Sequence, residues 1–235
     1  MNKTSIFILS TGIVVLSLLK SSPGESKEFW PQEAKSCPIG MVLVESPDNN
    51  IRICVDKYET SEKDLFDKAV PFSNQNYHSC KKLCARSGKR LLSHKEWRVS
   101  CLGTVPEKCN KYRKHPVARK IFMNGAWVYN GKNCKSEENA WGTCLQDPAI
   151  NLMANSLAPN SSFEQCVSKY GVVNMVGNLG EWVSDVRVVE GRSYGRFNGG
   201  LYAQKRSSCD YTTTAHSLEY RDYSLGCRCA MDLDT

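Results

Sequence analysis

A short segment of this chain brings together side chains suited to holding a hard cation. Residues 171–185 read Gly-Val-Val-Asn-Met-Val-Gly-Asn-Leu-Gly-Glu-Trp-Val-Ser-Asp. Glycines at 177 and 180 allow positive φ angles, so the loop can turn its carbonyls inward. Asn174 and Glu181 can then bring side-chain oxygens to the same point, and oxygens of this kind are calcium ligands. The spacing therefore predicts, in outline, a cage for a hard cation.

The second group of chemically important residues is the cysteines, of which there are twelve. An even and high count favours disulfides formed in an oxidising compartment. The C-x-C of residues 227–229 and the C-x3-C of residues 80–84 do not have the spacing of zinc ribbons, which disfavours zinc. We therefore expect a secreted or periplasmic protein rich in disulfide bonds.

The N-terminus agrees with export. Residues 5–19 form one apolar run that follows Lys3 and ends at Lys20. The run is short for a membrane span, so we interpret residues 1–26 as a signal peptide with cleavage between residues 21 and 26, and expect no membrane span after cleavage. An uncleaved anchor is the alternative. Residues 37–235 are expected to form one domain.

Charge and the remaining motifs exclude several classes of protein. The net charge of +7 is partly concentrated in residues 108–120, which we interpret as a solvated loop. Secretion and the lack of a recognisable module argue against nucleic acid as a partner. The four histidines are scattered and form no iron-binding triad. We expect His216 at the surface or hydrogen-bonded rather than acting as a general base, and Trp182 in the core.

The elements that must position these residues are short. Residues 37–59 read as two strands around the turn at residues 47–50, and Cys37 and Cys54 could then pair across them. Residues 76–87 show helical spacing, and Ser93 with Glu96 forms a capping box before a second helix. The polar stretch 102–168 reads as long loops. These features predict an α+β fold with little regular secondary structure.

Several motifs occur in the order seen in one known family. They are Cys54-Val-Asp-Lys-Tyr-Glu-Thr60, Gly88-Lys-Arg-Leu-Leu-Ser-His-Lys-Glu-Trp97, the loop 174–182, Gly199-Gly200 and Arg228-Cys229-Ala230. On these motifs the chain resembles the formylglycine-generating enzyme, or sulfatase-modifying factor, family, as a secreted member of bacterial type. The resemblance covers roughly residues 41–232. It implies a variant of the C-type-lectin-like fold, with a twisted antiparallel sheet and two helices wrapped by long loops.

The resemblance also implies specific ligands and bridges. Calcium would be held by the side chains of Asn174 and Glu181 and by the carbonyls of Gly177 and Leu179. Two disulfides would join Cys84 to Cys229 and Cys101 to Cys209. The pairing of the other cysteines outside the first hairpin stays open, and these are Cys80, Cys109, Cys134, Cys144, Cys166 and Cys227.

A departure from the family pattern decides the expected function. Catalytic members oxidise a substrate cysteine to formylglycine with oxygen and a copper(I) ion held by two thiolates. Counting forward from the glycine pair, the thiolate positions fall at Gln204 and Cys209. Counting back from Cys229, Cys209 is instead a structural half-cystine and both catalytic positions are deleted, which is the count we prefer. Copper(I) requires soft sulfur ligands, so copper is not expected on either count.

The expected function is a non-catalytic binding or accessory module. Its ligand, a protein, a peptide or a small molecule, would lie on the loop-rich face that catalytic relatives use for peptides. The alternative is an oxidoreductase of the same family that acts on a protein cysteine or a small molecule. Under that alternative Cys209 would be catalytic.

Overall fold

The computed structural model describes residues 36–62, 69–111, 126–129, 132–135, 146, 148–152 and 155–233, with the backbone alone at 126–129 and 132–135. The expected signal peptide, residues 1–26, lies outside this range. Within the described residues, no helix has the length and apolar character needed to cross a membrane.

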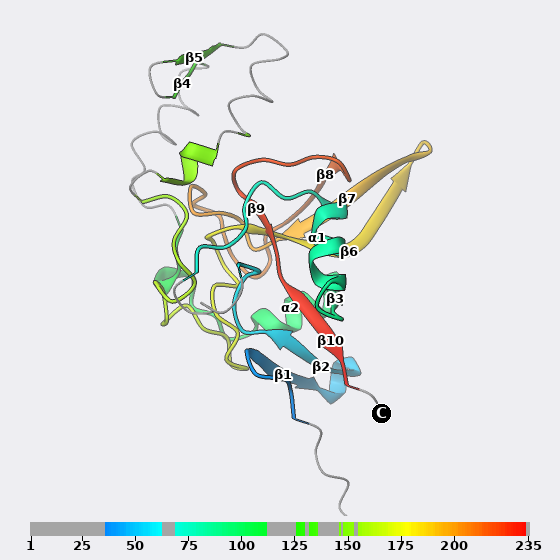
Figure 1. Cartoon of the computed structure of the whole chain (residues 1–235). Helices are drawn as coiled ribbons and strands as arrows, with labels where there is room; N and C mark the ends of the chain where they lie inside the picture. Colours follow the sequence, from blue (N-terminus) through cyan, green and yellow to red (C-terminus); the bar gives the residue numbers. More distant parts are fainter. Residues whose placement is uncertain are drawn as a thin grey trace, which may run out of the picture. The chain divides into compact units, whose positions relative to one another are not determined.

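Two four-stranded sheets, a two-stranded sheet of β4 and β5, and two short helices make up the regular structure of the described residues (Figure 1). In the first sheet the strand order is β1, β2, β10, β3, and in the second it is β8, β7, β6, β9. The strands are β1 Met41–Ser46, β2 Ile51–Asp56, β3 Arg90–Leu91, β4 Ala126–Tyr129, β5 Lys132–Lys135, β6 Gly180–Val189, β7 Arg192–Asn198, β8 Thr212–Ser217, β9 Leu225–Cys227 and β10 Cys229–Asp232. The helices are α1 Tyr77–Ala85 and α2 His94–Cys101, and short 3-10 turns span Pro47–Asn49, Pro106–Lys108 and Pro148–Leu152.

The local sequence signals correspond to these elements. β1 and β2 pair antiparallel in the expected hairpin. At the start of α2 the Ser93 hydroxyl accepts from the Glu96 amide, while the Glu96 carboxylate accepts from the Ser93 amide at 2.7 Å. The capping box is therefore confirmed, and it orients α2 so that Trp97 is directed into the core.

Two apolar clusters form the core. One includes Val44, Val55, Trp97 and Val183 and joins β1, β2, α2 and β6. The other, around Trp182, joins α1 to the second sheet, and Trp182 is 1% exposed. The prediction that Trp182 belongs to the core is thus confirmed.

Five disulfides tie the loops to this core. They are Cys37–Cys54, Cys80–Cys227, Cys84–Cys229, Cys101–Cys209 and Cys109–Cys166. The three bridges that the sequence and the resemblance suggested are all present. The bridges from α1 and α2 close segments of 145 and 108 residues, and such a bridge contributes typically about 2–4 kcal/mol. The side chains of Cys134 and Cys144 lie outside the described residues.

Candidate functional site: a buried charge network beside a closed cystine

The centre of the molecule holds a fully buried ion pair. Glu181 begins β6 and is 1% exposed, whereas Arg228 lies between β9 and β10 and is 0% exposed. The Arg228 Nη2 donates to Glu181 Oε1 at 2.7 Å, and its Nε lies 3.0 and 3.1 Å from the two carboxylate oxygens. The Trp97 Nε1–H donates to Glu181 Oε2 at 2.6 Å. One carboxylate thus joins α2, β6 and the closing strands.

A second buried carboxyl, Glu59, shares this environment. It is 2% exposed and accepts hydrogen bonds from Asn178 Nδ2 at 2.7 Å and from the Leu179 amide at 3.1 Å. Burial, and then the nearby charge of Glu181, raise the pKa of Glu59 to about 8. Of these two carboxyls, Arg228 bonds only to Glu181, and it lowers the pKa of Glu59 less than burial and Glu181 raise it, so Glu59 holds its proton at neutral pH and Arg228 balances the charge of Glu181.

The loop that carries the predicted calcium ligands has an unusual backbone. Asn174, Gly177 and Asn178 have φ angles of 59°, 78° and 51°. A side chain at Gly177 would place its Cβ 2.2 Å from the carbonyl oxygen of Asn110, so only glycine fits there. Asn and Gly are the residues that adopt the left-handed region at least cost, and this explains the spacing noted in the sequence.

Of the two side chains predicted to bind calcium, Asn174 has an oxygen available for a ligand, whereas the oxygens of Glu181 are already hydrogen-bonded. Asn174 is 1% exposed, and its Oδ1 has no hydrogen-bond partner among the described residues, so it is an available oxygen ligand. Both oxygens of Glu181, however, accept from Arg228, and one also accepts from Trp97. Calcium binding through Asn174, Gly177, Leu179 and Glu181 would require Arg228 to release part of this bonding. It stays a prediction.

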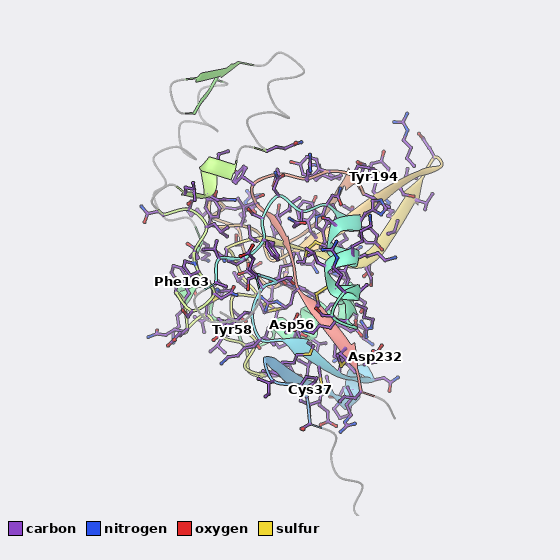
Figure 2. All side chains as sticks on the ribbon, in the orientation of Figure 1. Cys37, Asp56, Tyr58, Phe163, Tyr194 and Asp232 are labelled. Atoms are coloured by element: carbon purple, nitrogen blue, oxygen red, sulfur yellow. A yellow bond between two sulfur atoms is a disulfide. The ribbon has the colours of Figure 1, made fainter. Side chains whose placement is uncertain are left out.

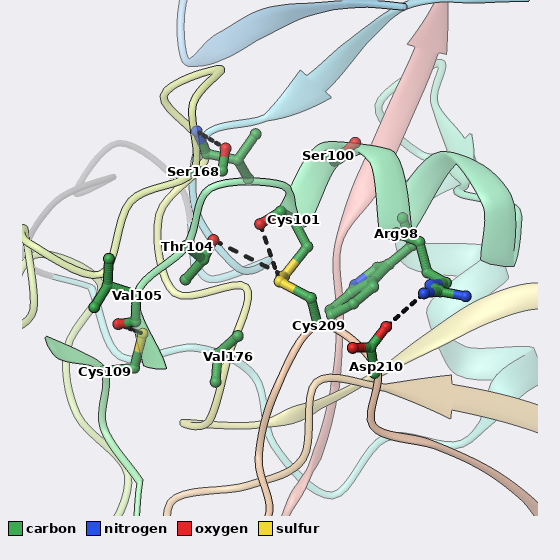
Figure 3. Close-up of a disulfide and its surroundings, with 12 residues drawn as sticks. Arg98, Ser100, Cys101, Thr104, Val105, Cys109, Ser168, Val176, Cys209 and Asp210 are labelled. Atoms are coloured by element: carbon green, nitrogen blue, oxygen red, sulfur yellow. Dashed lines mark hydrogen bonds and ion pairs between the residues drawn. A yellow bond between two sulfur atoms is a disulfide. The ribbon is translucent and has the colours of Figure 1, made fainter. Parts of the chain in front are cut away.

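Cys209, the second thiolate position when counting forward from the glycine pair, forms a disulfide. Cys209 is bonded to Cys101 at the end of α2 (Figure 3). Beside this disulfide, Arg98 Nη2 and Asp210 Oδ1 form an ion pair with 2.5 Å between the two atoms (Figure 3). The cystine lines a cavity of about 610 Å³ between α2 and residues 208–210. Gln204, the other counted position, supplies an amide, and its Oε1 is buried without a hydrogen-bond partner among the described residues. The residues present therefore do not fit a two-thiolate copper site.

The glycine pair has a structural explanation. Gly199 and Gly200 have φ angles of 88° and 79°. A Cβ at Gly199 would lie 2.7 Å from the Met175 carbonyl oxygen, and one at Gly200 would lie 2.3 Å from Ser207 Oγ. The two glycines therefore let the backbone pass close to Met175, in the loop 174–181, and to Ser207, before the chain reaches Cys209.

His216 occupies an aromatic stack. Its ring lies 3.9 Å from that of Tyr220 and 5.6 Å from that of Phe197, measured between centroids. Burial lowers the pKa of His216, and the charge of Asp222 opposes this shift. The ring is therefore packed between aromatic side chains on the second sheet.

Sequence reasoning missed two members of the network as site residues, Glu59 and Arg228. Both lie within motifs quoted for the resemblance, but nothing in their local spacing distinguishes them from exposed charges. Their role follows only from tertiary contact, since Arg228 and Glu181 are 47 residues apart.

The fold and this network define a class of protein, a small α+β domain in which irregular loops are joined by cystines and a buried Glu–Arg pair. Residues 44–233 match the sulfatase-modifying factor enzyme 1-like domain, and the chain belongs to that family.

Comparisons with individual proteins agree with this membership. The chain is 29% identical over 185 residues to the formylglycine-generating enzyme of Mus musculus, and 28% identical to that of Bos taurus. Each alignment covers 69% of this chain and 44% of the relative, so the matched region spans less than half the length of those proteins. Among solved structures, the Major Tropism Determinant I1 variant superposes with a TM-score of 0.55 at 12% identity, covering 83% of this chain and 53% of that one. This likeness shows the fold.

Proposed function

We propose that this protein is a non-catalytic binding or accessory module built on the sulfatase-modifying factor scaffold. The observation that supports this most directly is the Cys101–Cys209 bond. A cysteine that closes a structural bridge cannot also serve as a copper thiolate, and Gln204 offers only a hard amide oxygen. The described residues thus contain no pair of free thiolates at the place where the chemistry of catalytic relatives needs one.

The face available for binding is the loop-rich side near this cystine. It offers the cavity of about 610 Å³, which is lined by polar groups such as His94 and Ser208 and by apolar ones such as Val99 and Leu102. A pocket that combines a few polar groups with apolar walls suits a peptide or a small molecule. Calcium bound at Asn174 would support the loop structurally under this proposal.

The experiment is a direct assay for formylglycine. A peptide containing Cys-x-Pro-x-Arg is incubated with the purified oxidised protein, copper and oxygen, and its mass is followed, with a catalytic relative as the positive control. We expect no conversion of thiol to aldehyde. Alkylation of the native, unreduced protein should at the same time leave Cys209 unlabelled.

The alternative function, an oxidoreductase acting on a protein cysteine or a small molecule, is favoured by the 29% identity to a formylglycine-generating enzyme. Copper-dependent loss of the mass expected for aldehyde formation, together with alkylation of Cys209, would establish the alternative and refute the binding module.

A further inference from the structure

The hairpin formed by β6 and β7 presents arginines on one face. The two strands are joined by a two-residue turn, Glu190-Gly191, with φ angles of 50° and 73°. Cross-strand partners lie on the same face of a sheet, and residues along a strand alternate between faces. The register pairs Arg187 with Tyr194 and Val189 with Arg192. Arg187, Arg192, Tyr194 and Arg196 therefore share one face with the half-buried Val189, and we call it the arginine face.

The opposite face of the hairpin has a different character. Val188 pairs with Ser193 and Val186 with Gly195. This side continues into the core, because a Cβ at Gly195 would lie 2.5 Å from the ring of Trp182. Toward the turn, Val186 and Val188 are 41% and 66% exposed. The exposed valines and the arginines thus point in opposite directions.

The arginines of this face lack internal partners. None of Arg187, Arg192 and Arg196 forms an ion pair with an acidic group in the part of the chain that the structure describes. Arg187 and Arg192 are exposed, and Arg196 is half-buried with an Nε that has no hydrogen-bond partner among the described residues.

Cations at Arg192 and Arg196 flank Tyr194, whose position on the hairpin is labelled in Figure 2. Residues two apart in a strand are separated by about 6.6 Å. Arg192, Tyr194 and Arg196 therefore form a strip along β7 about twice that length, and Arg187 lies opposite Tyr194 on β6.

Two acidic residues lie near the strip, and among the described residues neither forms an ion pair with its arginines. Asp185, at the β-bulge in β6, accepts from the His94 amide at 2.5 Å and is engaged by the start of α2. Glu190 lies in the turn itself. The positive charge of Arg196 also acts on the first residue of α2, His94. Burial, and then the charge of Arg196, lower the pKa of His94.

From this arrangement we propose that the arginine face binds an acidic polysaccharide, a chain of sugars that carries sulfate or carboxylate groups. The planar fork of arginine binds oxyanions through two parallel hydrogen bonds, and the Tyr194 ring offers an apolar platform for a sugar ring between them. The inference does not depend on the proposed function, because none of the four residues that carry it lines the cavity beside Cys209.

Other occupants fit the face less well. A bilayer would have to accept arginines and exposed apolar side chains together, whereas the register places the exposed Val186 and Val188 on the reverse side and leaves the half-buried Val189 beside the arginines. A second copy of this chain would bring together two proteins of net charge +7. Nucleic acid is disfavoured by the five disulfides, which belong to an oxidising compartment.

The test measures binding of the purified, oxidised protein to immobilised heparin, a sulfated polysaccharide, over a range of NaCl concentrations. The test variant carries Arg187→Gln, Arg192→Gln and Arg196→Gln. The control variant carries Lys81→Gln, Lys82→Gln and Arg86→Gln, which removes the same charge from α1 and its C-terminal cap residue. Circular dichroism and the thermal midpoint establish that both variants are folded.

We expect the test variant to bind at least about tenfold more weakly, and its plot of log Kd against log salt to lose a slope of about one per arginine contact removed. The control variant should bind like the wild type, because α1 packs against Trp182, on the reverse side of the second sheet from the arginine face. Three results would overturn the proposal: no heparin binding by the wild type, equal loss in both variants, or binding only to phosphatidylserine vesicles. Binding to neutral dextran with the same affinity would also overturn it.

Discussion

Arg228→Met tests whether the buried charge network organises the fold. The substitution keeps a long apolar side chain but removes the guanidinium, which donates to Glu181 and also to the backbone carbonyls of Asp56 at 3.0 Å and Val173 at 2.9 Å. Glu181 and Glu59 would then be buried without a cation. Removing one partner of a buried pair costs about 3–5 kcal/mol, and each carbonyl left without a donor adds about 1–3 kcal/mol.

These terms are not additive, but their lower range is already about 5 kcal/mol, which is comparable to the whole stability of many domains. At about 2–4 °C per kcal/mol for a domain of this size, the thermal midpoint should fall by at least about 10 °C. The assays are thermal unfolding, which gives this midpoint, and urea unfolding, which gives the free energy of unfolding. Both use the oxidised protein and are followed by tryptophan fluorescence. Trp97 is a suitable reporter because it is fully buried and bonded to Glu181.

The matched control is Arg52→Met, since Arg52 forms an exposed pair with Glu45 at 3.5 Å. Exposed pairs contribute about 0–1 kcal/mol, so this variant should unfold nearly like the wild type. If Arg228→Met also loses less than about 1 kcal/mol, the network is not a structural centre and our reasoning about Glu181 and Glu59 is wrong.

Two further predictions concern protons and calcium. Because the folded-state pKa of Glu59 is raised to about 8, the folded protein binds more protons than the unfolded chain between about pH 4.5 and 8, so stability should fall as pH rises through this window, by at most about 1.4 kcal/mol per pH unit. Glu59→Gln should flatten this dependence in urea titrations at several pH values, and an unchanged slope would show that another group is responsible. Calcium at about one hundred times its Kd should stabilise the wild type by about 2.7 kcal/mol, whereas Asn174→Gly, which preserves the positive φ but removes the side-chain oxygen, should melt identically in calcium and in chelator. A wild type indifferent to calcium would refute the calcium site.

Local sequence signals predicted the parts of the fold that depend on neighbouring residues. The capping box at Ser93 and the hairpin of β1 and β2 use contacts within a few positions, so residue type and spacing were sufficient. The loop at residues 174–181 was recognised in part: Gly177 has the predicted positive φ, whereas Gly180 begins β6 without one, and the left-handed Asn174 and Asn178 were not predicted.

Pairings over long distances were accessible from the sequence only through family resemblance. The bridges Cys84–Cys229 and Cys101–Cys209 were anticipated in that way. Cys80–Cys227 and Cys109–Cys166 were not, because with twelve cysteines the spacing alone does not determine which sulfur atoms meet.

By itself, the sequence determined the family, the disulfide-rich α+β character and the positive φ of Gly177 in the loop 174–181, because each depends on residue types at short spacing. Tertiary structure alone decided that Arg228 neutralises Glu181, that Glu59 is buried beside them, and that the hairpin register collects three arginines on one face. The physical reason is that charge and burial depend on what surrounds a side chain in space, and those surroundings come from segments distant in the chain.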